Sequence, residues 1–412
     1  MTYEVAKEKE SFTPEMLDYL GRMKKVIDET FLPYRIAFNA NSYNRLKEIM
    51  PNETNRMFSA LMDSKLIASA VPKEFGGNWG FSCLQDALVS YEKIRMSKSG
   101  FFDCIIAPSG NFEVQCVRWS SHPDVKKAYM KRLLDGARGT FYITDPEAGV
   151  DSGAMNTTAI RDGDEYVING PKWWMCGTGP GYYGNNFHIL LAKTDPSKRS
   201  SGISTFLIDH DTEGQVYGRE GDLSAQRFDT RHEITLKDLR VPTNRILGQE
   251  GEGLRVLQDG INYNTVWYSY HGVAYAETAI EEVMEHAKKS VRFGSNLYEY
   301  QGVHYPIAEM IINAEVGRAM AHKAAILRDQ GDPSATLMGT ISLRYAGPMA
   351  ISVCTKAMEL LAGRGVERGE NNATEQLLRE AFIINLFRTP NLDKRFIASH
   401  YLGKKLKAGI VM

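Results

Sequence analysis

The hydrophobic pattern changes its period twice along the 412 residues, and this change limits the folds that the chain can adopt. Over residues 11–138 apolar side chains recur at helical spacing, and over residues 139–248 they alternate in short runs between Gly-rich turns. Helical spacing returns over residues 252–402. The pattern predicts an α+β protein of three domains: an N-terminal α-helical domain (1–138), a central antiparallel β-barrel or sandwich (139–248) and a C-terminal four-helix-bundle domain (249–412).

The same periods predict individual elements within these zones. The predicted helices cover residues 84–96, 254–270, 274–290, 307–329, 337–361 and 374–387. The predicted strands cover residues 140–144, 165–168, 188–192, 204–208 and 233–236.

Composition excludes several classes of protein. Lys and Arg number 49 and Asp and Glu number 50, so the chain lacks the basic excess of a nucleic-acid-binding protein, although a local patch for a phosphorylated ligand is compatible with this balance. No apolar run reaches the ~18 residues of a membrane-spanning helix, and the first ten residues are polar and charged, unlike a secretory signal. We therefore expect a cytoplasmic protein with reduced thiols and no metal site, since its cysteines have no metal-ligand spacing: Cys83, Cys104, Cys116, Cys176 and Cys354.

Short motifs follow one another along nearly the whole chain. They are Val71-Pro72 with Gly76-Gly77, the run Y-I-T-D-P-E-A-G-V-D at 142–151, Asn169-Gly-Pro-Lys-Trp-Trp174, Arg240-Val-Pro242 through Gly248 with Gly251-Glu-Gly253, Phe293-Gly294 with Gln301, Gly363-Arg-Gly365 and Arg379-Glu-Ala381. Each motif alone is weak, but the ordered set resembles the acyl-CoA dehydrogenase family of flavoproteins.

The resemblance implies a fold, a cofactor and a reaction. It implies a homotetramer of three-domain subunits, each binding FAD between the β domain and the bundle, with a neighbouring bundle completing the site. It also implies oxidation of the Cα–Cβ bond of an acyl-CoA. A carboxylate takes the α proton, flavin N5 accepts the β hydride, and an electron-transfer flavoprotein or similar protein accepts the electrons.

Four residues are expected at the flavin ring. The resemblance places Tyr142 and Thr144 at a strand end whose main chain and hydroxyl contact the flavin, and it places Trp174 as the stacking aromatic. Cys176 falls where the family has Thr or Ser facing N5, although a thiol is a weaker donor than a hydroxyl. The structural alternatives are an ordinary strand end, a core tryptophan and a tolerated small residue.

Phe293 and Gln301 match positions that contact the FAD of a neighbouring subunit, and the further cofactor-binding candidates of the bundle are Arg292, Glu359 and Gly363. The family's pyrophosphate-binding Arg falls on Ser290, and Arg292 is its candidate substitute because a guanidinium is long and binds phosphate in a forked geometry. Glu359 replaces the family's Gln and would repel pyrophosphate. These departures weaken the expected FAD contacts.

The largest departure concerns the catalytic base. The family's Glu falls on Arg388, which stays protonated in proteins, and the alternative position of that Glu falls on Asn264. One explanation is a relocated carboxylate, with Asp103 as the candidate because burial among aromatic residues would raise its pKa. Alternatively, Arg388 binds a carboxylate or oxyanion of the substrate. Asp103 as a helix cap or solvent-facing residue is the structural alternative.

Three functions therefore remain open at this stage. The first is an FAD enzyme that oxidises an acyl-CoA with a nonstandard base, where Tyr263, Trp267 and Tyr270 form either the wall of a pocket for a bulky or cyclic acyl group or simply bundle core. The second is a flavin monooxygenase or oxidase on the same fold. The third is a non-catalytic partner subunit of a hetero-oligomer.

Overall fold

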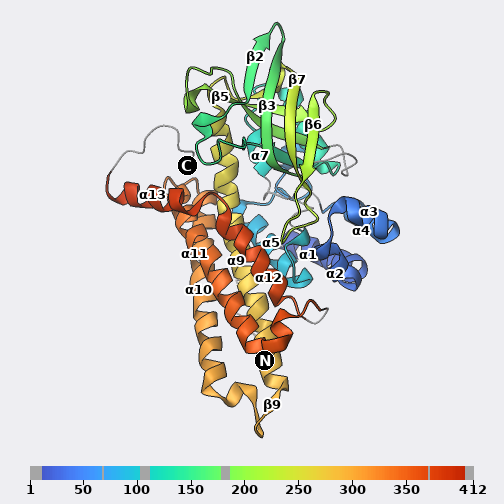
Figure 1. The fold of residues 1–412 in the computed structure, drawn as a ribbon, viewed down its shortest axis with the longest axis vertical. Coiled ribbons are helices and arrows are strands. Elements are labelled where there is room, and N and C mark those ends of the chain that lie inside the picture. Colours follow the sequence, from blue (N-terminus) through green and yellow to red (C-terminus); the bar gives the residue numbers. More distant parts are fainter. Residues whose placement is uncertain (1–11, 67–68, 103–111, 178–185, 370–371, 404–412) are drawn as a thin grey trace.

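Helices and strands segregate into three regions in the computed structural model, which describes residues 12–66, 69–102, 112–177, 186–369 and 372–403 (Figure 1). Long helices run side by side below a β-sheet, and shorter helices pack against their flank. The structure confirms the predicted class: a helical N-terminal part, a mostly antiparallel central sheet and a C-terminal helical bundle. Among the helices of the described ranges, none combines the length and apolar character needed to cross a membrane.

The N-terminal region is built from short helices. They are α1 (Pro14–Val26), α2 (Arg35–Ala40), α3 (Tyr43–Ile49), α4 (Pro51–Asp63), α5 (Cys83–Ser97), α7 (Phe112–Val117) and α8 (Pro123–Leu134). Ser82 and Gln85 form a capping box at the start of α5, which satisfies backbone groups that the first turn leaves open. The carboxylate of Asp329 also accepts from the N–H groups of Cys83 and Leu84 at 2.7 and 3.0 Å. This contact fixes α5 to the bundle.

The central sheet has the strand order β6-β7-β3-β2-β4-β5-β8, and β1 pairs with β4 in parallel. Its strands are β1 (Gly139–Tyr142), β2 (Thr158–Asp162), β3 (Glu165–Cys176), β4 (Phe187–Lys193), β5 (Ile203–Asp209), β6 (Gln215–Glu220), β7 (Arg231–Pro242) and β8 (Ile246–Leu247). Strands β4 and β5 are buried along almost their whole length. The alternating pattern did not predict β2 or β6, because each has mostly exposed side chains.

The C-terminal bundle consists of α9 (Gly253–Lys289), α10 (Gln301–Asp329), α11 (Ala335–Leu361) and α12 (Thr374–Leu386), followed by α13 (Pro390–Tyr401). A small hairpin of β9 (Val291–Arg292) and β10 (Ser295–Asn296) joins α9 to α10 at the end remote from the sheet (Figure 1). The sequence predicted two helices where the structure has the single 37-residue helix α9. At 1.5 Å per residue this helix is about 55 Å long.

Gly272 explains why α9 continues where a break was predicted. A Cβ at this position would lie 2.8 Å from the carbonyl oxygen of Ala346 and 3.1 Å from its Cβ. The glycine therefore lets α9 and α11 approach closely, and tertiary packing outweighs its low helix propensity.

A buried polar cluster also joins three helices of this region. Arg318 on α10 donates to both carboxylate oxygens of Glu277 on α9 at 2.5 Å and to the hydroxyl of Tyr91 on α5 at 2.8 Å. Burial and the charge of Glu277 raise the pKa of Tyr91, so its hydroxyl stays protonated and can donate to the carboxylate. The guanidinium of Arg318 and the carboxylate of Glu277 have opposite charges, so the cluster carries no net charge.

The Gly272 contact predicts a destabilising substitution. Gly272→Ala should lower the free energy of unfolding by about 1–3 kcal/mol, because the added methyl overpacks the α9–α11 interface. Gly302→Ala is the matched control: a Cβ there meets nothing within 4 Å, so the change should be neutral or slightly stabilising. Urea denaturation of both variants checks this, and equal stability would contradict the close-packing explanation.

Candidate functional site

A cavity of about 200 Å³ lies where the end of β1, the first turns of α9 and the α12–α13 connection meet. Its described lining residues are Phe112, Phe141, Ile143, Thr144, Gly149, Val150, Ser152, Leu257, Ile261, Asn264, Phe387, Arg388, Thr389 and Leu392. The cavity thus brings together three residues that the sequence singled out, namely Thr144, Asn264 and Arg388.

Strand β1 presents alternate side chains to the cavity and to the interior of the sheet. Phe141 lines the cavity, whereas Tyr142 is fully buried and its ring stacks on that of His188 with centroids 4.1 Å apart. The side chain of Tyr142 is therefore a core residue, and only its main chain remains available for a ligand. Phe141 was missed by the sequence analysis, although the period-2 alternation of a strand could have identified it.

The loop after β1 is held by a buried carboxylate. The backbone N–H groups of Asn156 and Thr157 donate to Asp145 Oδ2 at 2.7 and 2.8 Å, respectively. Lys172 Nζ donates to Oδ1 of the same carboxylate at 2.6 Å. Asp145 and Lys172 are each 1% exposed. Burial lowers the pKa of Lys172 to about 8, against the opposing effect of Asp145. This anchor positions the loop that carries Gly149, Val150 and Ser152 to the cavity wall.

A β-bulge in β3 places the two tryptophans. The pairing with β7 shifts register between Lys172 and Met175, and Trp174 has a φ of +61°, which is unusual for a non-glycine residue. Both indoles are half-buried, because the bulge interrupts the alternation of inward and outward side chains along the strand. The backbone N–H of Trp173 donates to the carbonyl of Thr144 at 2.9 Å, which joins β3 to the cavity edge. The indole of Trp174 lies against Gly221, with the guanidinium of Arg219 over its ring at 5.6 Å. Cys176 ends β3, opposite Arg231 in β7.

Arg388 is held in a buried ion cluster. Its Nη1 donates to Thr265 Oγ1 at 3.0 Å, and its Nη2 lies 3.1 Å from Oδ1 of Asp393. Asp393 also pairs with Arg344, whose Nε lies 3.0 Å from Oδ2. Burial lowers the pKa of Arg388, while Asp393 counteracts this shift. Asp393 was not predicted from the sequence, because nothing in the pattern of residues 386–395 pairs it with Arg388.

The five cofactor-binding candidates of the bundle lie far from the cavity, around the hairpin and the end of α11. All of them are exposed, and Phe293 at the hairpin tip is 98% exposed. Burial lowers the pKa of His286 on α9, and the charges of Arg364 and Arg292 lower it further. Both arginines therefore lie near His286, so the hairpin lies near the loop that follows α11. Asn264 lies in the first third of α9 and Lys289 is its last residue, so the two positions are about 38 Å apart at 1.5 Å per residue. The two groups of residues cannot face each other within one chain.

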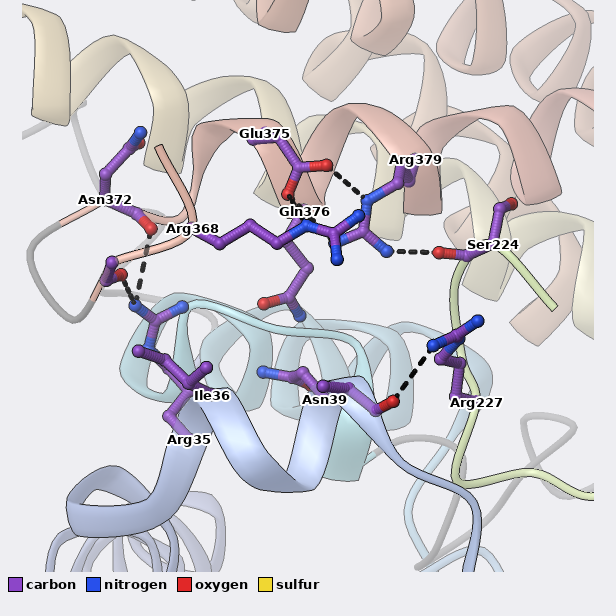
Figure 2. Close-up of a pocket in the computed structure, with 12 residues that line it drawn as sticks. Arg35, Ile36, Asn39, Ser224, Arg227, Arg368, Asn372, Glu375, Gln376 and Arg379 are labelled. Atoms are coloured by element: carbon purple, nitrogen blue, oxygen red, sulfur yellow. Dashed lines mark hydrogen bonds and ion pairs between the residues drawn. The ribbon is translucent and has the colours of Figure 1, made fainter. Parts of the chain in front are cut away.

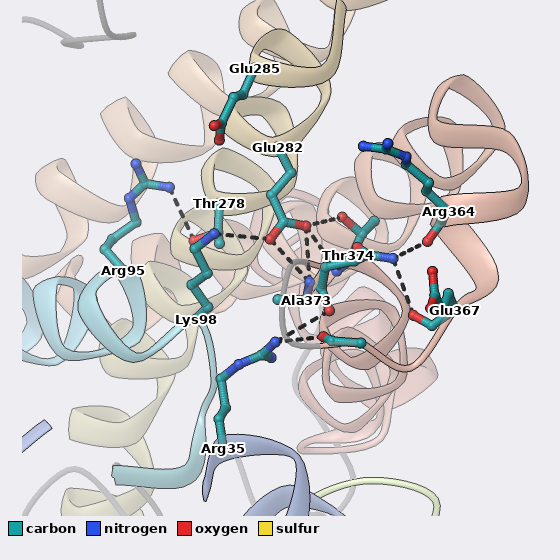
Figure 3. A network of polar contacts seen from close by, with 12 residues as sticks. Arg35, Arg95, Lys98, Thr278, Glu282, Glu285, Arg364, Glu367, Ala373 and Thr374 are labelled. Atoms are coloured by element: carbon teal, nitrogen blue, oxygen red, sulfur yellow. Dashed lines mark hydrogen bonds and ion pairs between the residues drawn. The ribbon is translucent and has the colours of Figure 1, made fainter. Parts of the chain in front are cut away.

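Beside this remote group lies a cavity of about 530 Å³, lined partly by the cations Lys98, Lys289 and Arg364. Glu282 of α9 forms its inner wall and caps α12 (Figure 3). Its carboxylate accepts from the N–H groups of Ala373 at 3.0 Å and Thr374 at 3.2 Å and from Lys98 Nζ at 3.2 Å. The negative charge of Glu282 thus stabilises the N-terminus of a helix.

A third pocket, of about 160 Å³, lies between α2, the β6–β7 connection and α12 (Figure 2). Its arginines bind backbone carbonyls: Arg35 donates to that of Gly369 at 2.9 Å, Arg227 to that of Ala40 at 3.1 Å, and Arg379 to that of Ser224. These bonds join the N-terminal region, the sheet and the bundle. We therefore interpret this pocket as a structural junction.

Two further predictions concern Asp103 and the aromatic residues on one face of α9. Asp103 lies outside the described residues. Tyr263, Trp267 and Tyr270 are each at most 5% exposed and none lines the 200 Å³ cavity, so their role is in the bundle core.

A buried carboxyl that the sequence did not indicate follows Phe112 on α7. Glu113 is 3% exposed, and its Oε1 has no hydrogen-bond partner in the part of the chain that the structure describes. Burial raises its pKa to about 7, while the charge of Arg138 acts in the opposite direction.

Two family models match the chain: "Acyl-CoA dehydrogenase, middle domain" over residues 140–239 and "Acyl-CoA dehydrogenase, C-terminal domain" over residues 251–388. Together they span more than half of its length. The chain belongs to the acyl-CoA dehydrogenase family. It is therefore an oxidoreductase of the acyl-CoA dehydrogenase type, a class of flavin enzymes that act on CH–CH bonds.

Individual relatives agree with this assignment. The chain is 29% identical over 358 residues to cyclohex-1-ene-1-carbonyl-CoA dehydrogenase of Geobacter metallireducens, covering 86% of this chain and 91% of the relative. It is 26% identical over 338 residues to acyl-CoA dehydrogenase of Bacillus subtilis, covering 82% and 86%. The solved structure of butyryl-CoA dehydrogenase from Megasphaera elsdenii superposes with a TM-score of 0.84 at 22% identity over 95% of this chain and 99% of that one. At this identity the superposition shows the shared fold.

The buried Asp145–Lys172 pair generates a prediction for the acyl-CoA dehydrogenase middle domain. Lys172→Met should lower the free energy of unfolding by about 3–5 kcal/mol, because it leaves a buried carboxylate without its counter-charge. Lys131→Met, at a side chain that is 69% exposed, should change it by no more than about 0.5 kcal/mol. Chemical denaturation measures both. A small effect of Lys172→Met would mean that the backbone N–H groups alone satisfy Asp145.

The raised pKa of Glu113 predicts a pH-dependent stability. The folded state favours the protonated carboxyl, so its stabilising contribution is full below the unfolded pKa of about 4.5 and is lost as the pH rises through about 7. Glu113→Gln should therefore gain stability over the wild type by about 3 kcal/mol between pH 4.5 and pH 7. Urea denaturation across this range tests it, with the exposed Glu147→Gln as a control that should run parallel to the wild type. Parallel curves for Glu113→Gln would contradict the buried neutral carboxyl.

Proposed function

We propose that this protein oxidises the Cα–Cβ bond of an acyl-CoA thioester, with FAD as its cofactor, in the cavity between β1, α9 and the α12–α13 connection. The observation that carries the proposal is the meeting of Thr144, Asn264 and Arg388 in one cavity, because these residues occupy family positions for the flavin and for the base in three separate segments. The relatives named for cyclohex-1-ene-1-carbonyl-CoA support a cyclic or bulky acyl group.

The residues around the cavity fit the flavin ring of FAD. Thr144 lines the cavity. The main chain of Tyr142, which precedes it in the chain by two residues, and the half-buried Trp174 are proposed to contact the flavin ring, as their family positions imply. Cys176 is proposed as the neighbour of flavin N5. FAD, when bound, supplies a ring that accepts the hydride equivalent from the β carbon.

The remote group of exposed residues fits the phosphate end of a second FAD. Arg292 and Arg364 supply positive charge beside His286, whereas Lys98 and Lys289 of the cavity there are paired with Glu282 and Glu285. Phe293, Gln301, Glu359 and Gly363 complete the proposed contact surface. Because this group lies about 38 Å along α9 from the cavity, it serves the cofactor of a neighbouring subunit. The active protein is therefore a homotetramer or a related oligomer.

The proton of the α carbon needs an acceptor other than Arg388. A guanidinium stays protonated, and no carboxylate occurs among the described residues that line the cavity. We therefore propose Asp103 as the base. Arg388 stabilises negative charge on the substrate instead. An electron-transfer flavoprotein or a similar protein reoxidises the enzyme.

The proposal predicts a visible reaction. The purified protein should be yellow, and its flavin should bleach anaerobically with an acyl-CoA from a panel that contains cyclohex-1-ene-1-carbonyl-CoA and linear acyl-CoAs. Asp103→Asn should keep the colour and slow bleaching by about 10²–10⁴-fold, since it removes general-base catalysis. Stopped-flow absorbance measures the rate.

Controls separate the base from other effects. Asp124→Asn, at an exposed position of α8, should bleach at the wild-type rate. Near-normal bleaching of Asp103→Asn would remove Asp103 from the mechanism. A colourless protein that acquires flavin only with a second chain would support a partner subunit, and rapid oxygen consumption with a hydroxylated product would support a monooxygenase.

A further inference from the structure

A glycine of α9 lies directly behind an aromatic side chain that lines the cavity of about 200 Å³. A Cβ at Gly260 would lie 2.3, 2.5 and 2.9 Å from Cδ2, Cε2 and Cγ of the Phe112 ring. Phe112 lines the cavity, whereas Gly260 is not among the described lining residues. The ring therefore occupies the space that a side chain at position 260 would take.

The helix that carries this ring, α7, is tied to the first turns of α9. The thiol of Cys116 donates to the carbonyl of Val256 at 3.7 Å, one turn before the glycine. Nε1 of Trp119, which follows α7, donates to Oδ2 of Asp259 at 2.8 Å. Because these contacts hold the backbone of α7 against α9, α7 cannot withdraw from α9 without losing them.

A second aromatic ring extends the same wall of the cavity. The ring centroids of Phe112 and Phe141 are 5.0 Å apart, and the two planes are tilted by 57°. Phe141 is half-buried on β1 and also lines the cavity. The position of this aromatic wall therefore depends on how closely Phe112 seats against α9.

A methyl group at position 260 would move the wall. Carbon atoms in favourable contact are about 3.5–4.0 Å apart, so the added Cβ would displace the Phe112 ring by about 1 Å or more. Phe112 is 1% exposed, and protein interiors are close-packed, so a displaced ring moves into space that is already open. The cavity that the ring borders is such a space. An alanine would thus make the cavity narrower.

We propose that Gly260 sets the width of the acyl cavity by letting the ring of Phe112 seat against α9. This inference rests on the proposed function and adds a residue that determines which acyl groups the site accepts. Gly260 acts through Phe112, so it is a positioning residue. The glycine leaves room for a ring-shaped acyl group, whereas an alanine would exclude it and still admit a narrow one. A difference of one methylene in an apolar pocket changes specificity by about 10–200-fold.

The test uses two thioesters that the proposed reaction cannot oxidise. In benzoyl-CoA the α carbon belongs to a ring and carries no hydrogen, and acetyl-CoA is narrow and has no β carbon. Calorimetry measures their dissociation constants on the purified, FAD-loaded protein. Gly260→Ala should raise the constant for benzoyl-CoA by about tenfold or more and change that for acetyl-CoA by no more than about twofold.

Two further variants separate the cavity from general packing. Combining Gly260→Ala with Phe112→Leu should restore most of the affinity for benzoyl-CoA, because the smaller side chain leaves room for the methyl group. Gly272→Ala is the matched control. This glycine of α9 is also crowded, against Ala346, but it lies about 18 Å along the helix from Gly260. Its substitution should lower stability and leave both dissociation constants unchanged.

A variant in the wild-type glycine background covers the case that Gly260→Ala does not fold. Phe112→Leu alone removes the ring from the wall and should widen the cavity. It should therefore bind 1-naphthoyl-CoA, which has two fused rings, about tenfold more tightly than the wild type does. Equal affinity of both proteins for this thioester would contradict the proposal.

The remaining results separate the role of Gly260 from the proposed function. An unchanged affinity of Gly260→Ala for benzoyl-CoA would overturn the proposal, and so would an equal loss in Gly272→Ala, since the effect would then follow stability. A double variant that restores nothing would show that Phe112 does not carry the effect. If acyl-CoAs bleach the wild-type flavin but cavity width has no influence, the proposed function stands and this inference is wrong. If no acyl-CoA binds or bleaches the flavin, the proposed function itself fails.

Discussion

Helix α9 positions both groups of predicted site residues, those at the cavity and those around the hairpin. It packs on α5, α7, α10, α11 and α12, and it begins against β5 of the sheet. Asn264 near its start faces the cavity, whereas His286 near its end lies beside the exposed cations of the hairpin and of the α11 loop. Because a single helix keeps these two positions at a constant separation, one chain cannot bring the two groups of residues together at one place.

The continuity of α9 depends in turn on close packing without a side chain. Gly272 allows the backbone of α9 to approach Ala346 of α11, and Gly260 similarly leaves room for the ring of Phe112 from the N-terminal region. Two glycines that are unfavourable for an isolated helix thus favour this helix in its tertiary setting. The same helix belongs to the bundle and forms part of the cavity wall, so it fixes the two relative to each other.

The sequence predicted the class of the fold and most of its long elements, because helical and strand periods are properties of local sequence. It failed where tertiary contacts decide. The two helices predicted over 254–270 and 274–290 are one continuous helix, whose Gly272 packs on α11, and the bulge at Trp174 interrupts the alternation of β3. Motif spacing identified Arg388 as an unusual residue. It could not identify Asp393 as its partner or Glu113 as a buried carboxyl, because both depend on how distant segments pack.

The buried charged side chains differ in how completely their charges are matched. Lys172 with Asp145, and Arg318 with Glu277, are matched pairs that join elements. The cluster of Arg344, Asp393 and Arg388 has two guanidinium groups and one carboxylate, and Arg344 also donates to the carbonyls of Asn385 and Phe387 at the end of α12. The carbonyl groups at the C-terminal end of a helix favour positive charge, so the fold itself offsets part of the charge of this cluster.

The same cluster explains why Arg388 and an acidic side chain are not interchangeable at this position. A glutamate here would remove one cation from the cluster and add a second carboxylate, so that Arg344 would be the cation left for Asp393. Desolvation and repulsion between two buried carboxylates raise their pKa values. Arg388 and Asp393 therefore form a unit, and a substitution at either position changes the electrostatic surroundings of the other.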